Sequence, residues 1–126
     1  MSEPYRRKRT FYQDVSGSLR VAAATDDSTL VSARVNHTLY LQKLHVEITA
    51  GSMGVTWSFT DGAGSPVPLV PSLDASGIVH YDFDFGPEGI PLTEEEDFLL
   101  NVSATGAAGW VSWEMYQKLT AVAAPA

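Results

Sequence analysis

Hydrophobic and polar side chains alternate over short runs of this chain, which is the period of a β-strand with one buried face. The clearest run lies within 78–92, IVHYDFDFGPEGIPL, and the turn at 86–89 ends it. One face of this predicted strand is apolar and largely aromatic, formed by Val79, Tyr81, Phe83 and Phe85. Because such a face needs a second layer to cover it, we interpret this strand as the element around which the chain is organised.

A longer alternating run, TLYLQKLHVEITA at 38–50, changes parity near Gln42. Its apolar positions are Leu39 and Leu41 on one parity and Leu44, Val46 and Ile48 on the other. A β-bulge or bend near Gln42 would bring both sets to the core side. A turn at 50–54 follows, and then an inward face made of Val55, Trp57 and Phe59. We expect these two runs to form a hairpin.

The remaining segments complete an all-β pattern. Short strands are predicted at 29–35, at 98–104 and at 110–119, and the proline-containing segment 67–71 suits an edge strand or an extended connection. Thr93–Glu96 fits either a capping box for one helical turn or an acidic loop. The total is seven or eight strands and no long helix. This pattern predicts a single β-sandwich, in a jelly-roll or an immunoglobulin-like arrangement.

Both faces of the last predicted strand carry aromatic side chains. Its core parity includes Trp113, whereas Trp110 and Tyr116 have the other parity. We expect these two residues either to be covered by the N-terminal segment or a neighbouring subunit, or to be ordinary exposed groups of a protein surface.

The chain is predicted to hold one domain with two flanking segments. Residues 1–28 show no sustained periodicity and are interpreted as an extended N-terminal arm with one short strand at Ser18–Ala22. The β-sandwich then occupies 29–120, and 121–126 is a short tail. The 126 residues include no cysteine and no apolar run of membrane-spanning length. We therefore expect a soluble protein, made in a cytoplasm, without disulfides or a membrane partner.

Charge is distributed unevenly. Residues 1–9 contain four cations against Glu3, a net charge of +3, whereas the remainder has four cations and fourteen carboxylates, a net charge of −10. An acidic body argues against nucleic acid as a partner. The candidate partner-binding residues of the arm are Arg6, Arg7, Lys8, Arg9, Phe11 and Tyr12. They would dock on an acidic protein surface; the alternative is a disordered leader.

Candidate chemistry is sparse. A calcium site could draw on His80, Asp82, Asp84 and Glu88, but alternate strand positions lie about 7 Å apart and further ligands would be needed. A glycosidase pair could be Asp82 with Asp84 or Glu114, although no flanking residues mark a substrate groove. Trp110 could stack on a sugar ring. No nucleophile motif or phosphate-binding glycine loop is present, so we expect no enzyme activity, cofactor or metal. The sequons at Asn36 and Asn101 are interpreted as chance matches.

Four segments carry a family resemblance: HTLYLQKLHVEITAG, VTWSFTDGAGSPV, YDFDFGPEGIPLT and GAAGWVSWEMYQKLT. Over residues 30–120 the chain resembles small β-sandwich virion proteins of tailed bacteriophages, of the capsid decoration (cement) type. The resemblance implies a homo-oligomer, with a trimer expected, that binds the major capsid protein on the virion surface and stabilises the shell. Deletion of Met1–Thr10 is then expected to abolish shell binding. The alternatives are a receptor- or carbohydrate-binding module of a tail or fibre, and a tail or neck connector.

Overall fold

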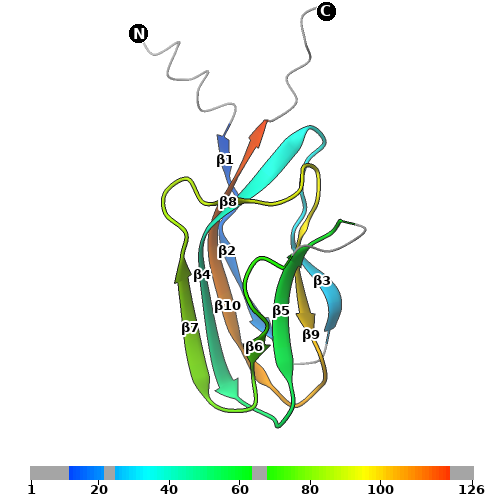
Figure 1. Cartoon of the computed structure of the whole chain (residues 1–126), viewed down its shortest axis with the longest axis vertical. Helices are drawn as coiled ribbons and strands as arrows, with labels where there is room; N and C mark the ends of the chain where they lie inside the picture. Colours follow the sequence, from blue (N-terminus) through cyan, green and yellow to red (C-terminus); the bar gives the residue numbers. More distant parts are fainter. Residues whose placement is uncertain (1–11, 22–24, 64–67, 120–126) are drawn as a thin grey trace, which may run out of the picture.

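The computed structural model describes residues 12–21, 25–63 and 68–119, and this part of the chain is all-β. Two antiparallel sheets face each other, with the strand ends gathered at the two ends of an elongated body (Figure 1). The predicted β-sandwich is therefore confirmed. No helix with the length and apolarity to cross a membrane occurs among the described residues.

The larger sheet has the order β1-β10-β4-β7, with β2 beside β10 and β8 beside β4. Its strands are β1 (Tyr12–Asp14), β2 (Gly17–Val21), β4 (His37–Ala50), β7 (Val79–Asp84), β8 (Ile90–Pro91) and β10 (Ala108–Leu119). The smaller sheet has the order β3-β9-β5-β6. Its strands are β3 (Thr25–Val31), β9 (Phe98–Val102), β5 (Thr56–Asp61) and β6 (Leu73–Asp74).

The β-bulge predicted near Gln42 is confirmed. In the pairing of β4 with β10, Lys43 lies opposite Glu114 and Leu41 lies opposite Met115, so Gln42 is the extra residue. A single extra residue reverses the parity of the side chains that follow it. As a result, the apolar residues on both sides of the bulge point into the same core and are almost completely buried, namely Leu39, Leu41, Leu44, Val46 and Ile48.

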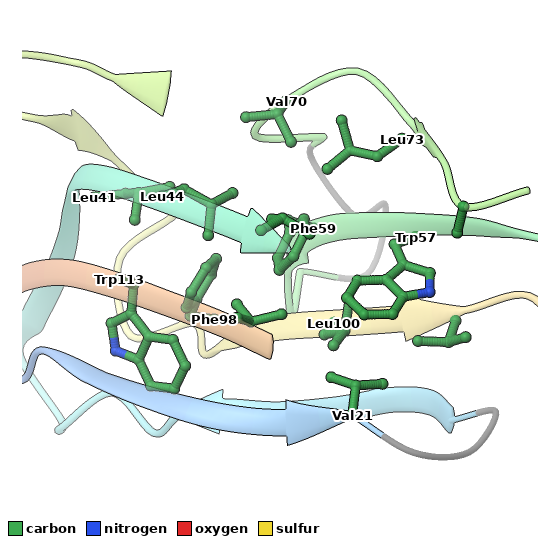
Figure 2. Close-up of a cluster of buried hydrophobic side chains, with 14 of the residues drawn as sticks. Val21, Leu41, Leu44, Trp57, Phe59, Val70, Leu73, Phe98, Leu100 and Trp113 are labelled. Atoms are coloured by element: carbon green, nitrogen blue, oxygen red, sulfur yellow. The ribbon is translucent and has the colours of Figure 1, made fainter. Parts of the chain in front are cut away.

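The core lies between the two sheets and is centred on aromatic side chains. Trp57 and Phe59 of β5 and Phe98 of β9 are fully buried, as the parity of their strands predicts. Figure 2 shows the Phe98 ring between Leu44 on β4 and Trp113 on β10, whereas Trp57 lies at the other side of the cluster. The rings of Phe98 and Trp113 meet edge to face, with centroids 6.0 Å apart, so the aromatic contacts join the two sheets directly.

The strand at 79–84 is not the centre of the fold. It is β7, at the edge of the larger sheet, and its residues Tyr81 and Phe83 are only half-buried. The central strands are β4 and β10, which pair along nearly their whole length. The expectation that this aromatic strand organises the chain was wrong because a heavy apolar face shows which side of a strand is inward, not the strand's place in the sheet.

The predicted hairpin of 38–50 with the following strand is also wrong. β4 belongs to the larger sheet and β5 to the smaller one, so the turn between them carries the chain from one layer to the other. Alternation in each strand is the same for a hairpin and for such a crossing. Thr60 makes an isolated bridge with Pro68, which agrees with the edge or connecting role expected for 67–71.

At Thr93–Glu96 the acidic loop is found and the helical turn is not. Glu96 N–H donates to the Thr93 carbonyl at 3.1 Å, and Glu95 has a φ of 66°. The Thr93 hydroxyl donates instead to the buried Asp61 carboxylate at 2.7 Å. This contact fastens the loop to the end of β5.

The larger sheet begins earlier than the predicted domain boundary at residue 29. β2 agrees with the short strand expected at Ser18–Ala22, and both β1 and β2 pair with β10. Residues 12–21 are therefore integrated into the sheet. Arg6–Arg9, Phe11 and the tail at 121–126 lie outside the described residues.

Deletion of Gln42 should strongly destabilise the protein. Without the extra residue, Leu39 and Leu41 would exchange faces with their neighbours, and exposing two buried leucines costs about 3 kcal/mol or more. The matched control, Gln42→Ala, keeps the bulge and removes only the side-chain hydrogen bond to the Pro87 carbonyl, worth about 1 kcal/mol. Urea unfolding measures both free energies, and equal losses would contradict the proposed role of the bulge.

Candidate functional site

The outer face of the larger sheet, which points away from the core, carries most of the residues singled out from the sequence. Directly opposite residues of neighbouring strands share a face, so the pairing registers assign the members of this surface. From β10 they are Trp110, Ser112, Glu114, Tyr116 and Lys118; from β4 they are Tyr40, Lys43, His45 and Glu47; from β7 they are His80, Asp82 and Asp84; and from the first strands they are Tyr12, Asp14, Ser18 and Arg20.

A polar cluster occupies the middle of this face. His45 Nδ1 lies 2.5 Å from Asp82 Oδ1, and His80 Nε2 lies 3.7 Å from Asp82 Oδ2. The hydrogen bond from His45 lowers the pKa of Asp82, and the nearby His45 and His80 rings lower it further when they are protonated. Glu47 adds a carboxylate oxygen 3.9 Å from His45 Nε2. All four side chains are exposed to solvent to a large extent, which weakens these contacts.

An open groove of about 510 Å³ adjoins this cluster and is lined by two of its members, His45 and Asp82. Ser112 forms part of its lining between longer side chains, and the other outer-face groups that line it are Lys43, His45, Asp82, Asp84 and Glu114. Lys43 and Glu114 lie directly opposite each other, with Nζ and Oε2 3.9 Å apart. The outer-face side chains that line the groove are therefore polar and carry both signs of charge.

The groove contains the three carboxylates considered for a glycosidase, Asp82, Asp84 and Glu114, and one of them, Asp82, lacks the property of a general acid. A general acid requires a pKa raised by burial, whereas the pKa of Asp82 is lowered. The residues considered for calcium are not gathered into a ligand set. Within the described ranges, no group of three or more acidic or histidine side chains is close enough to hold a metal ion.

An aromatic cluster lies at one end of the outer face, where β1 pairs with the end of β10. The Tyr40 and Tyr116 rings are stacked, with centroids 4.9 Å apart, and the Tyr12 ring lies 5.7 Å from Tyr116. Lys118 Nζ lies 5.7 Å from the centroid of Tyr12. Burial raises the pKa of Tyr116, and the neighbouring Tyr40, Tyr12 and Glu88 raise it further; its hydroxyl donates to the Glu88 carbonyl at 2.8 Å.

Trp110 lies at the other end of the outer face. Its pairing partners are Arg20 on β2 and Glu47 on β4, and 49% of its surface is exposed. Tyr12 is exposed to the same extent. The outer face thus presents an exposed aromatic side chain at each end, with the polar groove between them.

The described candidates are therefore brought onto one surface, although not into one site. Tyr12 and Tyr116 are in contact, and Trp110 is separated from them by the groove. Their partner-binding role stays a prediction, as does that of Arg6–Arg9 and Phe11. Sequence reasoning missed Tyr40, whose outward parity follows from the bulge, and the pairing of His45 with Asp82, which only the strand register reveals.

No protein-family model and no curated protein matches the chain. Solved structures with similar backbones include a protein of Bacillus endospore appendages, described as disulfide-linked pili, at a TM-score of 0.44 and 13% identity over 87% of this chain and 88% of the other. A virus-like particle of the prawn Macrobrachium rosenbergii extra small virus has a TM-score of 0.39 and 8% identity, over 84% of this chain and 79% of the other.

A family two carbohydrate esterase from Cellvibrio japonicus gives a TM-score of 0.33 and 11% identity, over 86% of this chain and 33% of the other. Two of these three structures come from assembled particles or filaments. Because each of these three TM-scores is below 0.5, the similarities assign neither a family nor a function to this chain.

The pKa of Asp82 should lie below the ordinary aspartate value of about 3.9. The folded state then favours the carboxylate, so this contact stabilises the protein above about pH 4 and the stabilisation is lost as the pH falls through the lowered pKa. In an NMR titration, His45→Ala should raise the pKa of Asp82 towards the ordinary value. Asp74, whose pKa is lowered by Ser76, should not respond. A parallel change in both residues would contradict the assigned contact.

Proposed function

We propose that this chain is a non-enzymatic structural protein of a tailed-bacteriophage virion, and that it binds the capsid lattice as a decoration protein and stabilises the shell. Its partners are then the major capsid protein and further copies of itself, with a trimer expected, on the outer surface of the capsid. The proposal joins the sequence resemblance over residues 30–120 to the surface of the larger sheet.

The observation that carries the proposal is the exposure of aromatic side chains on a rigid sheet. Trp110 and Tyr12 are each about half exposed; Trp110 projects from β10, the central strand next to β4, and Tyr12 projects from β1, which pairs with β10. Tyrosine and tryptophan are enriched at protein interfaces because they bury a large area at a small loss of conformational entropy. A binding surface held on paired strands suits a protein that must attach to a repeating lattice.

A carbohydrate-binding module of a tail or fibre is the second candidate. It is favoured by the position of Trp110 on the same sheet face as the polar groove, since sugar sites combine an aromatic platform with polar side chains. A tail or neck connector would use the same protein-binding surface as a decoration protein. Location and copy number in the virion separate it from the first proposal.

The first experiment is quantification of the chain in purified virions, combined with cryo-EM of the particle. We expect a copy number comparable with that of the major capsid protein, and density on the outer shell. A small number of copies at the tail or neck would favour the connector or the receptor-binding module. Absence from the virion would overturn the proposal.

Trp110→Ala should reduce occupancy of the shell by about tenfold or more, as expected for an exposed tryptophan at an interface. The control is Met53→Ala, which removes an exposed apolar group from the turn between β4 and β5, away from the outer face. The measure is the amount of each variant retained on chain-depleted particles. Unchanged binding of Trp110→Ala, together with glycan-array binding that this variant loses, would replace decoration by the carbohydrate-binding function.

A further inference from the structure

The edge of β7 is built to accept another strand. Within the described residues β7 pairs with β4 alone, and it forms the left margin of the body (Figure 1). Phe85 N–H donates to the Gln42 carbonyl at 2.8 Å, which makes Lys43 and Asp84 a non-hydrogen-bonded pair. Backbone groups alternate in direction along a strand. The N–H and C=O groups of His80, Asp82 and Asp84 therefore point away from β4.

Three other strands at the sheet edges, β3, β6 and β8, are less suited to this role. β6 and β8 have two residues each, and β8 contains Pro91. β3 is longer, but its pairing with β9 is interrupted by two register shifts, and such irregularities hinder further pairing. β7 has six consecutive pairs with β4 and contains no lysine or proline, the residues that proteins commonly use to block an edge.

The side chains of β7 specify the chemistry of the added strand. On the outer face, Asp82 and Asp84 would lie beside it, and the side chain of Asp82 is 66% exposed. On the inner face, the half-buried Tyr81 and Phe83 would gain cover and can also stack against cations. A second β7 paired antiparallel about Phe83 would place Asp82 opposite Asp84 and is disfavoured in that register. The fitting partner is an extended segment rich in cationic side chains.

We propose that the basic segment Arg6–Arg9 of a second copy of this chain adds to the edge of β7. The segment holds four of the eight cations in the sequence, with Tyr5 and Phe11 near its ends. Side chains of a strand alternate between faces, so in either register two of these cations face the β7 carboxylates and two face the aromatic side. The segment is thereby assigned to contacts between copies, in place of the direct capsid contact expected from the sequence.

The segment cannot reach the β7 edge of its own copy. It joins the body at Tyr12 in β1, on the opposite margin of the sheet, and a strand added to β7 lies four strand spacings, about 19 Å, from β1. Arg9 is three residues from Tyr12, and three extended residues span about 11 Å. Docking therefore requires a neighbouring copy, and repetition around a symmetry axis would close a ring.

The test uses the full chain in solution and is independent of virion binding. Light scattering after gel filtration should show an oligomer that dissociates as the salt concentration rises, because ion pairs are screened. An excess of a synthetic peptide of residues 1–11 should displace the arms and give the monomer. Deletion of residues 2–10 should do the same.

Backbone pairing is tested by His80→Pro against His80→Ala. The N–H of His80 points away from β4, so proline at this position removes that N–H and leaves the hydrogen bonds between β7 and β4 in place. Alanine keeps the N–H. We expect His80→Pro to raise the dissociation constant of the oligomer about tenfold or more, and His80→Ala to leave it nearly unchanged. Circular dichroism and thermal melting check that both variants are folded.

Charge is tested by Asp82→Asn with Asp84→Asn, against Glu47→Gln with Glu114→Gln. Both pairs remove two carboxylates from the same sheet face, but only the first pair lies on β7. The first pair should weaken assembly several-fold and flatten its salt dependence. The inference is overturned if the chain is monomeric at all salt concentrations tested, if the oligomer survives deletion of 2–10, or if both carboxylate pairs act equally.

Discussion

The extra residue at Gln42 is the constraint on which the larger sheet depends. The strands on both margins of the sheet are also interrupted next to this residue. Along β10, pairing changes from β1 to β2 at Glu114 and Met115, and along β4, pairing changes from β7 to β8 at Gln42. On one margin the Ser16 hydroxyl takes the place of a missing strand partner, since Met115 N–H donates to it at 3.0 Å. On the other, Gln42 donates through its side chain to the Pro87 carbonyl at 2.7 Å. The sheet therefore has a crease, which is the line of irregular pairing that crosses it at Gln42. Side-chain hydrogen bonds replace the missing backbone pairing at both ends of this line.

The crease also organises the outer surface. Because the parity change sends the aliphatic side chains on both sides of Gln42 inward, the outward positions flanking it are Tyr40 and Lys43. Tyr40 stacks with Tyr116 in the aromatic cluster, and Lys43 lines the groove. A regular strand would have placed either the leucines or these residues on the wrong face. Core packing and surface chemistry are thus fixed by the same irregularity.

Much of this arrangement is accessible from the sequence. The bulge follows from the parities of Leu41 and Leu44, and the buried aromatic residues follow from alternation. Both can be predicted because alternation within a single strand shows which of its side chains face the core. The predictions that were wrong concern how strands are arranged relative to one another. The position of β7 at an edge and the passage of the chain between sheets after β4 are set by pairing choices that leave no periodic trace in either strand. The contact of His45 with Asp82 requires the register of two strands separated by more than thirty residues.

An exposed edge strand normally threatens a protein with uncontrolled association. In β7 the carboxylates of Asp82 and Asp84 oppose self-pairing in the registers that set them against each other, since cross-strand pairs of like charge are unfavourable. The same carboxylates leave the edge open to a cationic segment, because cross-strand pairs of opposite charge are favourable. The body has a net charge of −10 outside residues 1–9, so only the basic segment combines an extended approach with the required sign. In the proposed assembly, selectivity for a cationic partner strand then comes from a single pair of acidic residues.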